Sequence, residues 1–333
     1  MKKQTFIIGA GLMVVVLLIF GAGVGAYTGY LGLSWDSGTA KIDDPALAKQ
    51  LQTSKQQDSD DGPEAIDILF LGTNAMESAP GPADSTASTG FLTDMIMVVH
   101  IPADRSGVQL VSIPNDTWVR VPGHGQGTVE SSAEDGGLPL AVQTISEFLA
   151  VDIDHVAVVD LAGLSALTDL VGGVEVESST AFESGGHDFR VGSNTLGGEA
   201  ALAFVCERTA FPKGDLQRIR NQQEFIRAVG TQVVSSDYEF NPVKMSELIR
   251  VLSPFLTVDS GLNASKLVKL GTQLKGISED DFDFVTAPTE VPVVTDGDGV
   301  RLTADRGGLE KLKQAIADDT VSDYSFRAED RHR

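Results

Sequence analysis

Short apolar runs rich in β-branched residues recur along this chain, with helical patterns between them. The runs lie at residues 66–72, 95–101, 108–114, 155–161 and 282–286. Several are almost continuously apolar, which is typical of strands buried on both faces. Apolar residues at helical spacing predict helices at residues 138–149, 161–170, 196–204, 215–234, 242–252, 262–274 and 309–316. Alternating strands and helices predict an α/β layer architecture with a mixed or mainly parallel sheet.

An uncharged, mostly apolar run covers residues 5–30 and follows Lys2 and Lys3. It is long enough to span a bilayer as a helix, and the basic residues mark the cytoplasmic side. We therefore expect residues 1–33 to form a single-pass membrane anchor with a cytoplasmic N-terminus and an extracytoplasmic main domain. The alternative is a cleaved signal peptide, for which residues 23–26 offer small side chains.

Composition predicts how the chain is organised after the anchor. Residues 34–64 are polar and acidic, so we expect a flexible linker that cannot bury enough apolar surface to fold. The extracytoplasmic domain is expected over residues 65–318, and a polar C-terminal tail over residues 319–333. We find no internal repeat, and no composition shift after Ile66 indicates a further boundary.

The chain is strongly acidic, with 25 Lys and Arg against 47 Asp and Glu in 333 residues and a net charge of −22. Nucleic acid is disfavoured as a partner, because phosphate backbones need a basic face. The single cysteine, Cys206, rules out an intrachain disulfide framework. The five histidines show no metal-ligand spacing, so we predict no zinc site.

Basic and amide side chains gather at the start of one predicted helix. Asp215 is a good N-cap, and Asp215, Arg218 and Gln222 fall at i, i+3 and i+7 and so share a face. Arg208 precedes the turn as a second guanidinium, and an anionic group could bind there beside the helix dipole. Lys213 is either a phosphate contact or a surface lysine. The plainer interpretation is that Asp215 only caps the helix and Arg218 lies in solvent.

Six sequence blocks occur in order: IDILFLG, TDMIMVVHI, VSIPNDTWVRVPGHG, DHVAVVDLAGLSALTDLVGGVEV, LGGEAALAFVCER and PKGDLQRIRNQQEF. In order and spacing they resemble the LytR-CpsA-Psr family, membrane-anchored phosphotransferases that attach anionic glycopolymers such as teichoic acid or arabinogalactan to peptidoglycan. The resemblance implies a three-layer α/β/α domain with a mixed central sheet and a hydrophobic tunnel for a polyprenyl chain. It also implies transfer of a phospho-glycan from a polyprenyl pyrophosphate lipid to a sugar hydroxyl of the wall.

The resemblance implies roles for the charged residues that the chain shares with the family. The candidate catalytic residues are Arg208, Arg218 and Asp116; the candidate substrate contacts are Asp215, Gln222, Arg120, Lys213 and Asn115; and the candidate Mg²⁺ ligand is Asp94. Such residue types suit phosphoryl transfer, which depends on positioning and charge neutralisation, because planar guanidinium donors match phosphate oxygens. Asp116 would orient the basic groups.

The chain departs from the family pattern at several charged places. Asn74 stands in a metal aspartate's place, Met76, Leu92, Asn115, Cys206 and Asn221 stand in arginine places, and Thr128 and Glu130 stand in Lys and Asn places. Losing one preorganised donor costs roughly 2.7–4 kcal/mol of transition-state stabilisation. Mg²⁺ binding is also in question, because Glu77 and Asp84 are either replacement ligands or solvated loop acids.

Two functions stay open at this point. The first is a phosphotransferase with a weakened site, in which the surviving arginines still hold the pyrophosphate. The second is a non-catalytic relative that binds the polyprenyl lipid or a wall-assembly partner. Trp118 and Phe204 either line a lipid tunnel or belong to the ordinary core.

Overall fold

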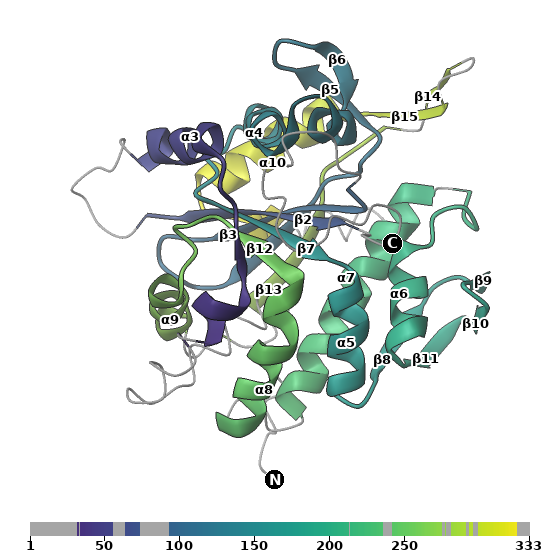
Figure 1. The fold of residues 1–333 in the computed structure, drawn as a ribbon. Helices are drawn as coiled ribbons and strands as arrows, with labels where there is room; N and C mark the ends of the chain where they lie inside the picture. The colour runs from purple at the N-terminus through teal and green to yellow at the C-terminus, as the bar shows by residue number, and fades with distance from the viewer. Residues whose placement is uncertain are drawn as a thin grey trace. The chain divides into compact units, whose positions relative to one another are not determined.

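The computed structural model describes residues 32, 34–55, 64–73, 93–212, 214–235, 242–274, 277, 281–290, 293–295 and 299–324. It shows a mixed α/β protein with a central mixed sheet (Figure 1). The strands, in order across this sheet, are β1 (Ala40–Lys41), β12 (Leu256–Val258), β7 (His155–Asp160), β2 (Ile66–Thr73), β3 (Met95–Ile101), β4 (Val108–Ser112) and β13 (Phe282–Thr286). The β1 and β12 pair is parallel, whereas β3 pairs antiparallel with β2 and with β4.

The predicted elements of the sheet are confirmed. The five apolar runs correspond to β2, β3, β4, β7 and β13, and all residues of β3 and β4 are buried. No helix among the described residues is long and apolar enough to cross a membrane. The predicted anchor at residues 5–30 lies outside those described residues.

Two compact units make up the chain, and each is built from two segments. The first comprises Met1–Lys41 and Val159–Phe282, and the second comprises Ile42–Val158 and Asp283–Arg333. Because the chain passes between the units more than once, no single linker separates them. A composition shift along the sequence could not have marked such a division.

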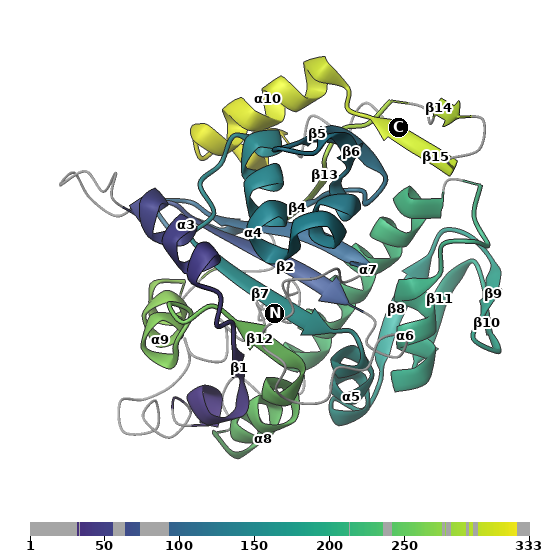
Figure 2. The same cartoon turned by 45° about the horizontal axis from the view of Figure 1, so that its top comes forward.

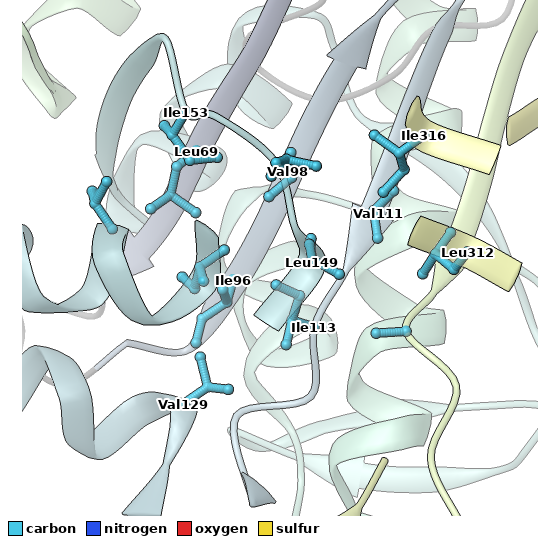
Figure 3. Packing of buried hydrophobic residues seen from close by; sticks show 14 of the residues in the cluster. Leu69, Ile96, Val98, Val111, Ile113, Val129, Leu149, Ile153, Leu312 and Ile316 are labelled. Atoms are coloured by element: carbon cyan, nitrogen blue, oxygen red, sulfur yellow. The ribbon is translucent and has the colours of Figure 1, made fainter. Parts of the chain in front are cut away.

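In the second unit, helices cover one face of β2, β3 and β4 (Figure 2). These helices are α3 (Pro45–Lys55), α4 (Val129–Leu149) and α10 (Arg306–Ala317). Their apolar side chains pack with those of the strands, and Figure 3 shows Leu69, Val98, Val111, Leu149, Leu312 and Ile316 in this core. Each fully buried side chain of this kind stabilises the fold by about 1.5–3 kcal/mol.

Helix α4 begins earlier than the predicted helix at residues 138–149. Gly136 and Gly137 interrupt it with non-helical backbone angles, and Gly137 has φ of 64° and Pro139 follows. Thr128 is the N-cap of the first segment, and its side chain accepts a hydrogen bond from Ser131 N at 3.1 Å. The sequence pattern therefore indicated only the segment after the kink, because glycine pairs and proline usually end helices.

The prediction of a flexible linker over residues 34–64 is wrong for the part that the structure describes. Residues 34–38 are helical, and Trp35 is 1% exposed and donates from Nε1 to the carbonyl of Leu262 at 3.3 Å. In the second unit, Leu47 and Leu51 of α3 belong to the core. Few apolar residues suffice here because they lie at i and i+4 on one helix face.

The predicted polar tail is also wrong at its start. Val321 is 1% exposed and belongs to the core of the second unit, and residues 321–324 are helical. Asp319 contacts His100 of β3 at 3.0 Å. A single apolar residue and one carboxylate thus fix a segment whose composition alone suggested a solvated tail.

The first unit consists mainly of helices and short hairpins. Its helices are α5 (Ala162–Leu170), α6 (Gly198–Cys206), α7 (Gly214–Ser235), α8 (Pro242–Leu252), the 3-10 turn η2 (Ser253–Phe255) and α9 (Ala264–Gln273). Its antiparallel strand pairs are β8 (Val174–Ser178) with β11 (Gly192–Leu196) and β9 (Phe182–Ser184) with β10 (His187–Phe189). Helix α6 packs against both α5 and α7, so the start of α7 lies on a supported surface.

A smaller sheet in the second unit was not predicted. Its strands, in order, are β14 (Val293–Thr295), β15 (Gly299–Thr303), β5 (Thr117–Val121) and β6 (Gly125–Thr128). Strand β5 directly follows the Asn115-Asp116 segment and pairs parallel with β15. The chain beyond β13 thus returns to the neighbourhood of a candidate site residue.

Candidate active site

In the first unit, one face of α7 carries a buried charged cluster. Arg218 Nη2 donates to Asp215 Oδ1 at 2.8 Å, and the two side chains are 5% and 4% exposed. Arg208 Nη1 lies 3.7 Å from the same oxygen, and its side chain is 45% exposed. Gln222 is buried on the same face, as the i, i+3, i+7 spacing predicted. One carboxylate therefore balances one buried guanidinium and orients a second that reaches solvent.

Two details of the sequence interpretation need correction. Helix α7 begins at Gly214, so Asp215 lies inside its first turn and not at the N-cap. The alternative that Arg218 lies in solvent is wrong, because its side chain is buried against Asp215. A buried guanidinium needs a paired anion, since an unpaired charge in the interior is strongly disfavoured. Arg220, two residues further on, is exposed and points away from the cluster.

The turn that carries Arg208 is fixed at several points. Glu207 accepts hydrogen bonds from Thr209 Oγ1 at 2.9 Å and from Ala210 N at 2.8 Å. Burial works against ionisation of Glu207, but hydrogen bonds from Ser184, Ala210 and Thr209 outweigh it and lower the pKa of this carboxyl. The turn therefore keeps an ionised carboxylate at its start.

An aromatic cluster anchors the other end of this turn. Phe211 packs edge-on against Phe182 with ring centroids 4.8 Å apart, and Phe182 stacks on Phe189 at 4.5 Å. Phe204 of α6 completes the cluster and is fully buried. The interpretation of Phe204 as an ordinary core residue therefore fits its packing, and the cluster limits the positions open to Arg208.

Gly214 permits the close approach of the turn to the helix. A Cβ at this position would lie 2.9 Å from Arg208 Cγ and 3.0 Å from Arg208 O. We therefore expect Gly214→Ala to displace Arg208 and to lower stability by about 1–3 kcal/mol, as overpacking does. Thermal unfolding would measure the stability loss, and Arg220→Ala, a substitution at an exposed position of the same helix, is the control. A Gly214→Ala protein as stable as the wild type would contradict the close contact.

Amide side chains of α7 hold the end of α6. Asn221 Nδ2 donates to Phe204 O at 3.1 Å, and Gln222 Nε2 donates to Val205 O at 3.3 Å. Gln217 Nε2 donates to Asn221 Oδ1 at 3.1 Å. The last carbonyls of a helix have no partner within the helix, and these amides supply one. Asn221, which stands in a family arginine's place, therefore has a structural bond that sequence reasoning missed.

In the second unit, Asp94 and Asp116 lie on segments that meet at one edge of the sheet. The Asn115 amide donates to the Thr93 carbonyl, and Asp94 N donates to Gly72 O at 2.8 Å. Glu130 N, at the start of α4, donates to Asn115 O at 3.2 Å. Asn115 is buried, so it joins the segment after β4 to the segment before β3 and does not face solvent. Its side-chain amide therefore connects two backbone segments. The role of Asn115 as a substrate contact stays a prediction.

The structure thus brings the predicted residues together in two groups, one in each unit. Asp215, Arg218, Gln222 and Arg208 form the group at the start of α7, and Asp94, Asn115 and Asp116 form the group at the sheet edge. Arg120 belongs to neither group and is exposed on β5. Lys213, Asn74, Met76, Glu77, Asp84 and Leu92 lie outside the described residues.

The donor set for Mg²⁺ is small in the part of the chain that the structure describes. No group of three or more His, Cys, Asp or Glu side chains there could hold a metal ion. Asp94 supplies one half-buried carboxylate at the sheet edge. Mg²⁺ often uses only one or two protein carboxylates together with substrate phosphates and water, so Asp94 fits this minimal form of site.

A mixed α/β fold with guanidiniums held by an aspartate at a helix start defines a protein suited to binding phosphorylated anions. Comparison with known proteins identifies the family of the chain. The chain belongs to the LytR_cpsA_psr family, which matches residues 30–317. The resemblance found in the sequence blocks is therefore confirmed.

Two relatives and one solved structure illustrate the family. LcpA of Corynebacterium glutamicum, a cell wall biosynthesis protein, is 30% identical over 269 residues, which are 70% of this chain and 51% of LcpA. The chain therefore matches about half the length of LcpA. The polyisoprenyl-teichoic acid–peptidoglycan teichoic acid transferase TagU of Enterococcus faecalis is 28% identical over 270 residues, covering 81% of this chain and 83% of TagU. B. subtilis TagV has a similar fold, with a TM-score of 0.61 at 21% identity, covering 78% of this chain and 98% of TagV.

Proposed function

We propose that this protein transfers a phosphate-linked glycopolymer from a polyprenyl pyrophosphate lipid to peptidoglycan. Arg208, held by Asp215 at the start of α7, is the observation that carries the proposal. Two guanidiniums share one carboxylate, and Arg208 is half exposed, so its planar donors can reach a phosphate group from solvent. Family membership and the name of TagU, at 28% identity, support the same chemistry.

The proposed reaction needs charge neutralisation more than covalent help from the protein. A sugar hydroxyl of the wall attacks the glycan-linked phosphorus, the bond to polyprenyl phosphate breaks, and the hydroxyl proton passes to the departing phosphate. Arg208 binds the phosphate oxygens, the start of α7 adds positive potential, and Arg218 holds the Asp215 carboxylate that orients Arg208. In the second unit, Asp94 stays the candidate Mg²⁺ ligand, and the ion would supply charge neutralisation for phosphate oxygens.

Turnover is proposed to be lower than in relatives with a full set of arginines. Asn115 and Asn221 occupy arginine places, and each uses its amide to bind a backbone carbonyl. Neither supplies a cation to the substrate. This observation also favours the second candidate function, in which the protein binds the polyprenyl lipid or a wall-assembly partner without catalysis.

The proposed setting is the cell membrane, with residues 1–33 as a single-pass anchor and the N-terminus in the cytoplasm. The support is the uncharged run at residues 5–30 after Lys2 and Lys3. The full proposed fold is a three-layer α/β/α domain. A domain anchored in this way would meet both the lipid carrier and the wall.

The Arg208→Ala variant tests the proposal. We expect transfer from a polyprenyl pyrophosphate-linked glycan to peptidoglycan to fall about 10²–10³-fold, because a preorganised charge donor is lost. Arg208 is half exposed, so its removal should leave stability nearly unchanged. Arg220→Ala, an exposed arginine of the same helix, is the control and should retain activity.

The assay uses the full chain in detergent and counts labelled glycan bound to peptidoglycan, with and without Mg²⁺. Equal activity in Arg208→Ala and the wild type would contradict the assigned role. A folded wild-type protein that binds the lipid without turnover would favour the binding function over the transferase.

A further inference from the structure

Strand β5 presents two kinds of side chain on its two faces. Thr117, Val119 and Val121 are buried, and the two valines belong to the core of the second unit. Between them, Trp118 is half-buried and Arg120 is exposed. The period of two along a strand places Trp118 and Arg120 together on the outward face. Trp118 is therefore not an ordinary core residue.

Strand pairing adds four more residues to this outward face. Thr128 is opposite Trp118 and Gln126 is opposite Arg120 on β6. Thr303 is opposite Trp118 on β15, and Arg301 is two residues before it. The outward face thus comprises Trp118, Arg120, Gln126, Thr128, Arg301 and Thr303. It holds two arginines, in a chain with a net charge of −22, and Asp116, which precedes β5, is level with Arg301 in the same register.

Arg301 is held in place by the aromatic ring. Its guanidinium carbon lies 3.9 Å from the centroid of the Trp118 ring. In a stacked arrangement the N–H groups stay in the guanidinium plane, where they can donate to phosphate oxygens. Stacking therefore orders the cation at the surface of the strand pair.

The outward face adjoins the candidate site. Leu302 N donates to the carbonyl of Asp116 at 3.0 Å, so β15 places Arg301 beside the Asn115-Asp116 segment. Both belong to the second unit. Arg301 is far from every matched motif in the sequence, so only the strand pairing reveals it.

We propose that the outward face of β5 and β15 binds the polyanionic part of the glycopolymer, with Arg301 and Arg120 contacting its repeating phosphates and Trp118 packing on its sugar or polyol carbons. The identity of the polymer rests on the proposed function. An acidic protein repels a polyanion at long range, so a local surface of arginines is needed to hold the chain. Spaced phosphates suit arginines that stand on two different strands.

Binding of poly(glycerol phosphate) to the full chain in detergent tests this proposal. We expect Arg120→Gln with Arg301→Gln to raise the dissociation constant about tenfold to hundredfold, because two charge-assisted contacts are lost. The exposed Arg306 of α10 provides the control Arg306→Gln, which removes one charge from the same unit. Weaker binding at higher salt, with a smaller salt dependence in the double variant, is also expected.

Trp118 supplies a second readout that does not depend on affinity. The chain has two tryptophans, and Trp35 is 1% exposed whereas Trp118 is half-buried. Acrylamide should therefore quench mainly Trp118, and bound polymer should reduce that quenching. The Trp118→Phe variant should lose the polymer-dependent change while Trp35 still reports a folded protein.

The outcomes separate this inference from the transferase proposal. Polymer binding that is absent in the wild type, unchanged in the double variant, or equal for neutral dextran would overturn it. Binding that depends on both arginines, in a protein with no transfer activity, would support it while the proposed reaction fails. Conversely, transfer of a short donor with no arginine-dependent polymer binding would support the transferase proposal and overturn the proposed polymer-binding surface.

Discussion

Replacing Asp215 by alanine is expected to lower the free energy of unfolding by about 3–5 kcal/mol, because a buried guanidinium loses its anion. Asp215 Oδ1 lies 2.8 Å from Arg218 Nη2, and both side chains are almost fully buried. Arg208 shares the same oxygen at 3.7 Å. Two like charges would then face each other with no carboxylate between them. Denaturant unfolding monitored by circular dichroism measures the loss.

The double variant Asp215→Ala with Arg218→Met separates charge from packing. Methionine keeps much of the buried volume and removes the charge, so most of the lost stability should return. Arg220→Ala is exposed on the same helix and should change stability by less than about 0.5 kcal/mol. If Asp215→Ala costs no more than Arg220→Ala, the buried pair does not stabilise the helix start.

The arrangement at this helix start was partly predictable from sequence. Spacing alone placed Asp215, Arg218 and Gln222 on one face, and their burial agrees with that. The depth of burial was not predictable, because it depends on how α6 packs against α7. For the same reason the bonds from Asn221 and Gln222 to the end of α6 had no local signal.

The fold was likewise predictable where the signal is local and not predictable where it depends on contacts between distant segments. Long, nearly continuous apolar runs predicted β2 and β3, because burial on both faces leaves a strong pattern. The strand β6, Gly125–Thr128, carries no such pattern, since its residues are half-buried or exposed. Arg301 became a candidate only through the pairing of β15 with β5, a contact between distant parts of the chain.

A second buried charged group lies in the second unit, on the central strand β3. His100 is 1% exposed, with Nδ1 at 2.9 Å from Asp67 Oδ1 and Nε2 at 3.0 Å from Asp319 Oδ1. Asp319 also accepts from Ala103 N at 2.9 Å, and it follows the end of α10. His100 therefore fastens the segment after α10 to the central sheet. Arg105 and Asp154 are the other charged groups near this cluster.

Stability is expected to fall as pH rises above the ordinary histidine pKa of 6.5. Burial alone would lower the pKa of His100, but the hydrogen bond and charge of Asp67 and the charge of Asp319 outweigh it and raise the pKa. Above 6.5 the unfolded imidazole is neutral while the folded one still holds its proton. The folded state thus binds more protons, and its advantage disappears as pH rises through the folded pKa.

His100→Gln should remove this pH dependence and destabilise the protein at neutral pH. Glutamine cannot carry the positive charge that balances Asp67 and Asp319, and removing one partner of a buried charged group costs about 3–5 kcal/mol. His124→Gln is the control, because His124 is about half exposed and its one ion-pair distance among the described residues is long, at 3.9 Å from Nδ1 to Asp135 Oδ2. Unfolding free energies of the three proteins across neutral and mildly alkaline pH provide the measurement. If the unfolding free energies of the wild type and His100→Gln changed with pH in the same way, His100 would be neutral in the folded protein. The contacts of His100 with Asp67 and Asp319 would then be hydrogen bonds between a neutral imidazole and the carboxylates.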